Sequence, residues 1–179
     1  MIEVLVTIVI ISFGLLGMAG LQSRMQISEM EAYQRAQALV LLNDMAARIG
    51  TNRNVAALYV TTALPTGSTC PDASSSPSPT PGQMQQTDTH EWCLALQGAA
   101  EVQSASKLGA VVGGRGCVDS LGNGEYMVTI AWQGLVPLSA PPSTVTCGQN
   151  LYNGATGSAC VNDLCRRVVT TIVRVAPLV

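Results

Sequence analysis

The first 21 residues form an almost uninterrupted apolar segment, MIEVLVTIVIISFGLLGMAGL, whose only formal charge is Glu3. As a helix, about 20 apolar residues at 1.5 Å each cross a hydrocarbon layer about 30 Å thick. A carboxylate at one end of such a segment is costly in lipid and indicates a function that involves a partner. The nearest cation, Arg24, lies roughly 30 Å further along the helix. The partner of Glu3 is therefore expected on another chain.

The helical pattern continues beyond the apolar segment, because there is no Pro or Gly between Leu21 and Ile49. Apolar side chains recur there at intervals of three and four residues, with charged residues between them. They are Met25, Ala32, Tyr33, Ala36, Leu39, Val40, Met45, Ala46 and Ile49. Gly50 is a natural helix stop. We predict one helix from about residue 2 to 49.

This helix is expected to have two halves, an apolar one over residues 1–23 and an amphipathic one over residues 24–50. The apolar half must lie in lipid or against copies of itself. A cleaved signal peptide is less favoured, because such a peptide starts with basic residues and has an apolar run of about 7–15 residues. This chain has no basic start, and its apolar run is longer.

The remaining part, residues 51–179, has a size that suits one globular head of roughly 130 residues. Only 11% of the chain is charged, 4% is aromatic, and the net charge is −2. The head is therefore expected to be rich in small residues and loops. A chain without a basic field is not expected to bind nucleic acid non-specifically.

All six cysteines lie in the head, and an even number there indicates disulfides formed in an oxidising compartment. No C-x-x-C spacing points to a metal site. The connectivity does not follow from the sequence, although Cys70–Cys93 and Cys160–Cys165 are natural short closures. The disulfide candidates are Cys70, Cys93, Cys117, Cys147, Cys160 and Cys165.

The head is expected to contain two long loops and one further helix. Residues 64–87 have a Ser/Pro-rich centre that cannot bury a core and predict a flexible loop. The sequence around Thr87 can cap a helix that continues to about Lys107, with Gly109 as its end. Residues 134–164 form the second long loop. Residues 55–60 could extend the spine helix after a break or form a short strand.

Three antiparallel strands are expected, and a fourth is possible. Residues 117–119 lead to the hairpin turn signal Asn123-Gly124, and residues 125–133 alternate as a strand. Residues 166–175 form the last strand. The fold class is therefore α+β: a long N-terminal spine helix packed on a small antiparallel β-sheet head with disulfides.

Candidate catalytic and ligand-binding residues are few. His90, the only histidine, is expected to be exposed at a helix start rather than to bind a metal. Asp119, Asn123 and Glu125 have oxygens that could bind Ca²⁺, but their spacing is that of a hairpin turn. No serine has a G-x-S-x-G setting, and no base is placed beside a nucleophile. The chain is not expected to be an enzyme and no cofactor is indicated.

Three other features of the head and spine have simple interpretations. Trp92 and Trp132 are expected in the core, and the pair Arg166-Arg167 is expected to form a solvated strand edge rather than an anion site. Gly14, Gly17 and Gly20 could form a close-packing helix face or weak points where the helix melts. The sequence does not choose between these two alternatives.

The segment Ile2-Glu-Val-Leu-Val6 followed by the run Ser12-Phe-Gly-Leu-Leu-Gly-Met-Ala-Gly-Leu-Gln22 resembles the N-terminus of type IV pilins and pseudopilins. The chain is most similar to minor pilins of the PilV type, which Gly116-Cys-Val118, Ala131-Trp-Gln-Gly134 and Cys165-Arg-Arg-Val168 also fit. The resemblance implies a pilin-like fold. It also implies a role for Glu3, whose carboxylate would pair with the N-terminal amine of a neighbouring subunit.

The resemblance further implies a place in the cell and a set of partners. The chain would lie in the inner membrane of a Gram-negative bacterium, with its head in the periplasm, and in the extracellular pilus. It would be cut and N-methylated by prepilin peptidase, and would join other minor pilins, the major pilin and the inner-membrane assembly platform. The basic leader ending in Gly that the family carries is not in this sequence, so the true start is expected upstream of Met1.

The function implied is that of a minor pilin that helps to prime pilus assembly and supports motility and adhesion. One alternative is a minor pseudopilin of a type II secretion system, which would suit a smaller head with fewer disulfides. Another is a membrane-anchored periplasmic enzyme or binding module, which would need a deep pocket with convergent polar groups and would have no need of Glu3.

Overall fold

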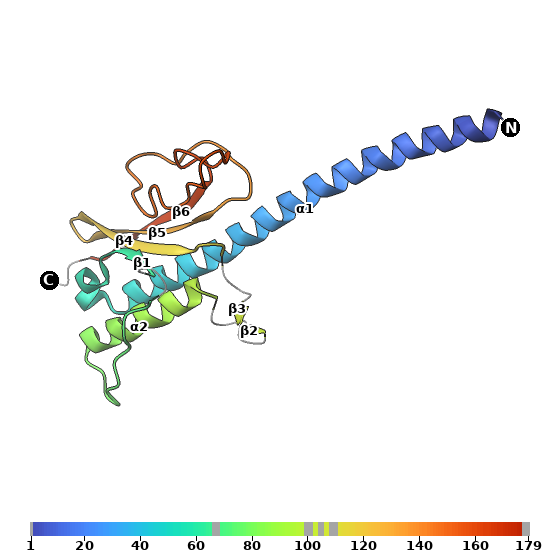
Figure 1. Cartoon of the computed structure of the whole chain (residues 1–179). Helices are drawn as coiled ribbons and strands as arrows, with labels where there is room; N and C mark the ends of the chain where they lie inside the picture. Colours follow the sequence, from blue (N-terminus) through green and yellow to red (C-terminus); the bar gives the residue numbers. More distant parts are fainter. Residues whose placement is uncertain (1, 66–68, 99–101, 104–105, 108–110, 177–179) are drawn as a thin grey trace. The chain divides into compact units, whose positions relative to one another are not determined.

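The computed structural model describes residues 2–65, 69–98, 102–103, 106–107 and 111–176. The chain forms two compact units, Met1–Tyr33 and Gln34–Val179. Helix α1 (Ile2–Thr51) supplies the first unit and the beginning of the second (Figure 1). It is followed by the 3₁₀ helix η1 (Arg53–Tyr59). The prediction of one long N-terminal helix is therefore confirmed.

The second unit is built on a four-stranded antiparallel sheet in the order β1-β4-β5-β6. Its strands are β1 (Thr61–Leu64), β4 (Arg115–Gly122), β5 (Glu125–Gln133) and β6 (Arg166–Arg174). Gly122 pairs with Glu125 across a two-residue turn in which Asn123 and Gly124 have φ values of 54° and 75°. Positive φ at both positions matches the twist of a hairpin. The Asn-Gly turn signal is therefore confirmed.

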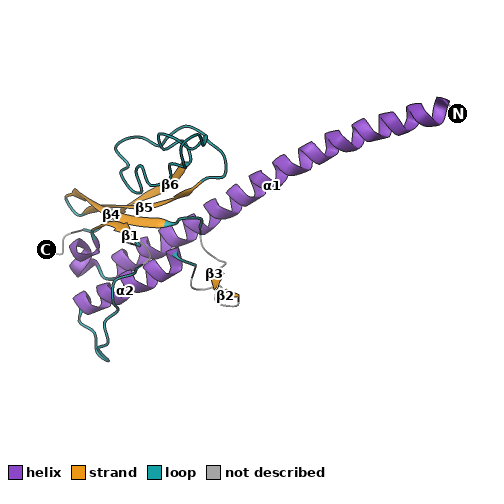
Figure 2. Ribbon diagram, viewed as in Figure 1, coloured by secondary structure: helices purple, strands orange, loops and turns teal. Residues whose placement is uncertain are grey.

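One face of the sheet packs against helices, as Figure 2 shows. Helix α2 (Pro81–Leu96) and the second half of α1 meet there. The alternation expected for residues 125–133 is confirmed, since Val128, Ile130 and Trp132 all point into this core. Both tryptophans are buried as expected. The other buried members include Leu42, Met45, Ile49, Trp92, Leu96 and Val118.

The other face of the sheet is covered by the long segment between β5 and β6, which contains no helix or strand. Cys117, Ala131, Cys147 and Tyr152 form a small buried cluster there. Strand β5 is therefore buried on both faces. This explains why neighbouring β5 residues such as Ile130 and Ala131 are both inaccessible to solvent.

Helix α2 differs from the prediction at both ends. It begins at Pro81 rather than near Thr87, because Thr80 and Gln83 form a reciprocal capping box: the Thr80 hydroxyl accepts from the Gln83 N–H, and the Gln83 side chain accepts from the Thr80 N–H. The predicted loop 64–87 is thus wrong over its last residues, which are helical. The helix ends at Leu96.

The segment that was expected to continue this helix forms short strands instead. Strands β2 (Val102–Gln103) and β3 (Ser106–Lys107) pair as a small hairpin. The expected stop at Gly109 lies outside the described residues. Residues 55–60 are mostly in η1, which favours the first of the two alternatives left open for them.

Three disulfides staple the second unit, and the described cysteines are all paired. Cys70–Cys93 joins the Ser/Pro-rich loop to α2, and Cys160–Cys165 closes a tight loop before β6. Both were suggested by the sequence. The third disulfide, Cys117–Cys147, ties β4 to the loop that covers the outer face, with the two Cα atoms 5.8 Å apart.

Candidate functional site

The first unit of the chain exposes nearly all of its apolar surface. From Ile2 to Tyr33 the side chains are exposed, apart from the half-buried Glu31. Phe13, for example, keeps 71% of its surface accessible. This part of α1 is long and apolar enough to cross a membrane, a property that a signal sequence shares. Such a surface is not stable in water and needs a lipid or protein environment.

Polar groups within this apolar segment are satisfied by the helix itself. The Thr7 hydroxyl donates to the Val4 carbonyl at 2.9 Å, and the Ser12 hydroxyl donates to the Ile8 carbonyl at 2.7 Å. Neither group therefore opposes burial in an apolar environment. Glu3 differs, because its exposed carboxylate makes no ion pair with any other residue that the structure describes.

The three glycines of this segment leave open space on the helix. A Cβ atom added at Gly14, Gly17 or Gly20 would meet nothing within 4 Å. The isolated chain therefore gives no intramolecular reason for glycine at these positions. A close-packing face and a weak point in the helix both remain predictions.

Within the second unit, helix α1 has one buried face and one exposed face. The residues that α1 buries there are Gln34, Ala38, Leu42, Met45 and Ile49. Of the apolar set expected from the sequence, only Met45 and Ile49 belong to this buried face. Leu39 and Val40, which were expected to share it, are exposed, and Val40 keeps 63% of its surface accessible.

The exposed residues between Ala36 and Ala47 carry no charge, and we name them the outward strip. They are Ala36, Leu39, Val40, Asn43 and Ala47. The solvent side of a helix in a globular protein is normally charged or polar. An uncharged strip of small and branched side chains instead suits close contact with another chain.

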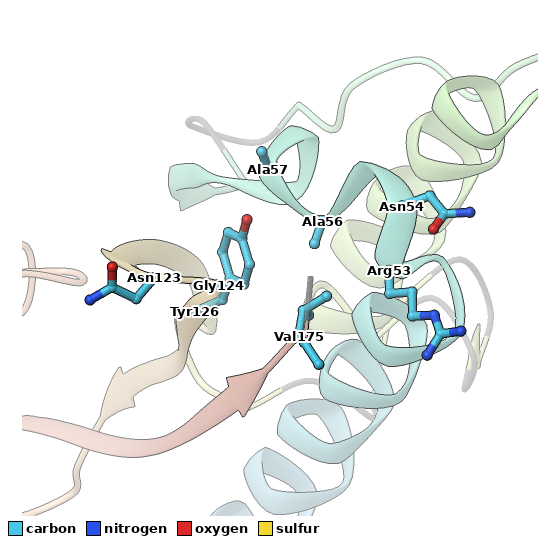
Figure 3. Close-up of a pocket in the computed structure, with 9 residues that line it drawn as sticks. Arg53, Asn54, Ala56, Ala57, Asn123, Gly124, Tyr126 and Val175 are labelled. Atoms are coloured by element: carbon cyan, nitrogen blue, oxygen red, sulfur yellow. The ribbon is translucent and has the colours of Figure 1, made fainter. Parts of the chain in front are cut away.

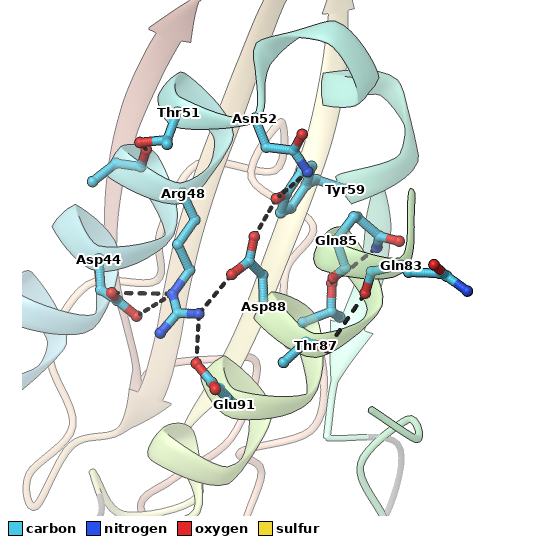
Figure 4. A network of polar contacts seen from close by, with 12 residues as sticks. Asp44, Arg48, Thr51, Asn52, Tyr59, Gln83, Gln85, Thr87, Asp88 and Glu91 are labelled. Atoms are coloured by element: carbon cyan, nitrogen blue, oxygen red, sulfur yellow. Dashed lines mark hydrogen bonds and ion pairs between the residues drawn. The ribbon is translucent and has the colours of Figure 1, made fainter. Parts of the chain in front are cut away.

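A polar network fixes the end of α1 to α2, as Figure 4 shows. Arg48 Nε donates to Asp44, and Arg48 Nη1 donates to Asp88 and Glu91, both at 2.8 Å. Burial lowers the pKa of Arg48, but the hydrogen bonds and charge of the three carboxylates outweigh burial and hold that pKa above its ordinary value. The guanidinium is thus a fixed charge that ties the two helices together.

The same network reaches η1. Tyr59 donates a short hydrogen bond to Asp88, and Asn52 Nδ2 donates to the Tyr59 oxygen at 3.1 Å and to the Pro81 carbonyl at 2.8 Å. Burial, with the hydrogen bond to Asp88, raises the pKa of the Tyr59 phenol. Because the inner side of α1 is held at several points, the outward strip has a defined orientation on the second unit.

The pair Arg166-Arg167 does not form a solvated edge, and that prediction is wrong. Arg166 is only 1% exposed, its Nε lies 3.2 Å from an Asp163 oxygen, and its Nη1 donates to the carbonyls of Val145 and Cys147. Arg167 donates to further carbonyls of the same loop. Both side chains bind the covering loop to the start of β6, so they have a structural role.

A hollow of the second unit with a volume of about 620 Å³ lies between η1, the β4–β5 turn and the end of β6 (Figure 3). Tyr126, Ala56 and Val175 line it, together with Arg53 and Asn54 of η1. A binding site for a small molecule normally has a few convergent polar groups. The labelled polar side chains do not converge here.

The remaining sequence candidates have ordinary surroundings. His90 lies in the middle of α2, not at its start, with its Nδ1 2.6 Å from the Pro71 carbonyl oxygen. Glu125 pairs with Arg174 at 2.8 Å, and burial raises the pKa of Asp119. Within the described part of the chain, no group of three or more His, Cys, Asp or Glu residues is arranged to hold a metal ion.

Sequence reasoning missed the outward strip and the Arg48 network. The strip had a signal, because apolar residues at positions 36–40 fill more of the helix circumference than one buried face needs. The network had only the local pair Asp44 and Arg48 as a signal, since Asp88 and Glu91 come from a helix about forty positions away in sequence. Comparison of the chain with models of known families, with curated proteins and with solved structures finds no match.

Proposed function

We propose that the chain is a minor pilin of the type IV pilus, of the PilV type, that helps to prime pilus assembly and supports motility and adhesion. The observation that carries this proposal is the exposed apolar part of α1 with its single acid at Glu3. The resemblance of residues 2–22 to pilin N-termini gives that acid a role. Its carboxylate would pair with the N-terminal amine of a neighbouring subunit when both enter the filament.

Physical chemistry supports such a transfer. An apolar helix that moves from lipid into a bundle of similar helices stays in an apolar environment, so the exchange changes little hydrophobic free energy. A carboxylate gains most from a partner that is also removed from water. Pairing of Glu3 would then be the interaction that favours the filament over the bilayer. The uncharged outward strip would offer a separate contact surface on the second unit.

The proposed place of the protein is the inner membrane, with the head in the periplasm, and the extracellular pilus of a Gram-negative bacterium. Its partners would be other minor pilins, the major pilin and the inner-membrane assembly platform, after cleavage and methylation by prepilin peptidase. The disulfides suit an oxidising compartment.

The decisive experiment compares Glu3→Val with Glu29→Val in cells that carry no other copy of the protein. Glu29 is a matched control, because it is an exposed acid of the same helix and the same unit but lies outside the apolar segment. The measurement is the amount of each variant in sheared pili relative to the membrane fraction.

We expect Glu3→Val to stay in the membrane fraction and to fall at least about tenfold in pili, the change in equilibrium that a loss of about 1.4 kcal/mol produces. Glu29→Val should enter pili as the wild type does. Wild-type incorporation of Glu3→Val would remove the pairing role. Failure to find the wild-type protein in pili would remove the proposed function altogether.

A further inference from the structure

The two edge strands of the sheet, β1 and β6, differ greatly in how well they are protected against pairing with another chain. Strand β1 has four residues, an irregular register against β4, and Pro65 directly after it. Strand β6 has nine residues, pairs with β5 in a continuous register, and contains no Pro or Lys. Folded proteins usually shorten, bulge or charge an edge strand to prevent it from pairing with other chains. The edge at β6 lacks most of these devices.

The hydrogen-bond pattern identifies which backbone groups of β6 face outward. Val175 N–H donates to Gly124 O, and Gly134 N–H donates to Cys165 O. These two bonds set the alternation of the ladder, so the odd-numbered residues of β6 bond to β5 and the even-numbered residues face the free edge. Thr170, Ile172 and Arg174 therefore present their N–H and C=O groups outward.

These outward groups have no backbone partner in the described parts of the chain. The covering loop leaves the edge early, because Leu138 bonds to Leu164 just before β6 begins. Beyond it lies a hollow of about 300 Å³, lined by Pro141, Pro142 and Val168 among others. From Thr170 onward the edge is open, and 51% of the Ile172 surface is accessible.

We infer that the free edge of β6 receives an extended segment of a different pilus subunit, which adds a fifth strand to the sheet. The inference rests on the proposed function, and it names the kind of contact by which the head joins its neighbour. Recognition of this type uses main-chain hydrogen bonds for affinity and alternate side chains for specificity. Three outward residues of β6 accommodate a segment of about five residues.

The side chains along the edge define the chemistry of that segment. Ile172 lies beside Met127 on the outer face, so the residue paired with Ile172 should be apolar. Arg174 is 78% exposed at its side chain but already pairs with Glu125 of β5 at 2.8 Å, so it sets no charge for the residue that pairs with it. On the inner face, the segment would extend the apolar row of Val169 and Val173.

A second copy of this chain is a poorer occupant. Antiparallel pairing of two β6 strands places a two-fold axis normal to the sheet. Residues 34–51 of α1 pack along the sheet face (Figure 1), so this axis would reverse their direction in one copy. Residues 34–51 of the two copies would then run antiparallel to each other. That arrangement does not suit two chains anchored in one bilayer.

The first test measures amide hydrogen exchange of residues 168–175 in the full-length chain, in detergent and in sheared pili. The amides of Thr170, Ile172 and Arg174 should exchange freely in detergent and at least about tenfold more slowly in pili, while the inward amides stay protected in both. Equal exchange of the outward amides in both states overturns the inference. Protection that appears in detergent and disappears on dilution would identify a second copy and overturn it too.

The second test uses Ile172→Pro with Ile172→Val as its control. Proline removes the outward N–H of residue 172 without removing a bond to β5, because that N–H faces the free edge. We expect Ile172→Pro to reach the membrane with its disulfides formed but to fall at least about fivefold in pili, and Ile172→Val to match the wild type. Wild-type incorporation of Ile172→Pro contradicts the inference. If that variant does not fold, the exchange measurement on the wild type decides.

The two proposals fail in different ways. If the wild-type chain is absent from pili, the proposed function is wrong. If it is present in pili and its outward amides exchange freely there, only the added strand is wrong.

Discussion

Gly116 is the position where the packing of the head can be tested most directly. It lies on β4 against the indole ring of Trp92. An ideal Cβ at Gly116 would be 2.2 Å from Cη2 of Trp92 and 2.6 Å from its Cζ3. Ordinary carbon contacts are about 3.5–4.0 Å, so Gly116→Ala requires the ring to move by about 1.3 Å or more.

The ring has little freedom to move. Trp92 is fully buried, and its indole N–H donates to the Leu41 carbonyl on α1 at 2.9 Å. Overpacking of this kind costs about 1–3 kcal/mol, and weakening the hydrogen bond costs about 1 kcal/mol more. Removing a glycine from the unfolded chain offsets about 0.5 kcal/mol of this loss. Gly116→Ala should therefore lower the free energy of unfolding by about 2–3 kcal/mol.

The assay is urea unfolding of the full-length protein in detergent, followed by tryptophan fluorescence, since Trp92 and Trp132 both lie in the core. With a slope of about 2 kcal/mol per M, the midpoint should fall by about 1 M. Gly50→Ala is the control, because a Cβ there meets nothing within 4 Å and alanine is the better helix former. An unchanged midpoint for Gly116→Ala would show that the described contact between β4 and α2 is wrong.

Two further predictions concern buried polar groups. Burial holds the pKa values of Tyr59 and Tyr152 above the ordinary value of 10. The folded state therefore retains these two protons more tightly than the unfolded state does. The stability that the two tyrosines contribute is present below pH 10 and is lost as the pH rises above it. Urea midpoints should therefore fall between pH 9 and pH 11, less steeply in Tyr59→Phe, and equal slopes would contradict this. Arg166→Met should cost about 3 kcal/mol, because it leaves the buried Asp163 carboxylate without its cation and two loop carbonyls without their donor. Limited proteolysis should then cut the loop between β5 and β6, and Asp163→Asn added to Arg166→Met should restore part of the protection.

Those elements whose signals are local could be predicted from the sequence. Strand β5 and the Asn123-Gly124 turn are set by period-two alternation and by the φ preferences of two adjacent residues. The start of α2 was also local, since Thr80, Pro81 and Gln83 spell a capping box with proline at the first position. It was missed because the neighbouring Ser/Pro-rich composition was given more weight than the cap.

Features that depend on distant segments could not be predicted in this way. Arg166 is buried and Arg167 half-buried because loop carbonyls from residues 136–164 converge on them. No spacing within the strand indicates that convergence. An arginine pair at a strand start normally stays in water, because burying an unpaired charge is costly. The loop reverses that expectation by supplying acceptors and one carboxylate.

Helix α1 shows how a correct element can be assigned a wrong face. Its apolar residues occupy more of the circumference than one buried stripe requires, and Gln34 lies inside the buried stripe whereas Val40 lies outside it. The spacing of apolar residues along α1 therefore does not by itself identify which side of the helix faces the core. The choice is made by Trp92 of α2 and Ile130 of the sheet, which form the surface that α1 meets.

The excess of apolar residues on α1 is itself informative. A helix that needs only one partner places charges on its remaining surface, because charges keep a monomer soluble and limit association. Between Ala36 and Ala47 the only charged residue of α1 is Asp44, which is half-exposed and paired with Arg48. A sequence with two apolar sides on one helix therefore specifies two neighbours. The chain itself supplies one through α2 and the sheet. Under the proposed function, the outward strip is the surface on which a second pilus subunit would pack.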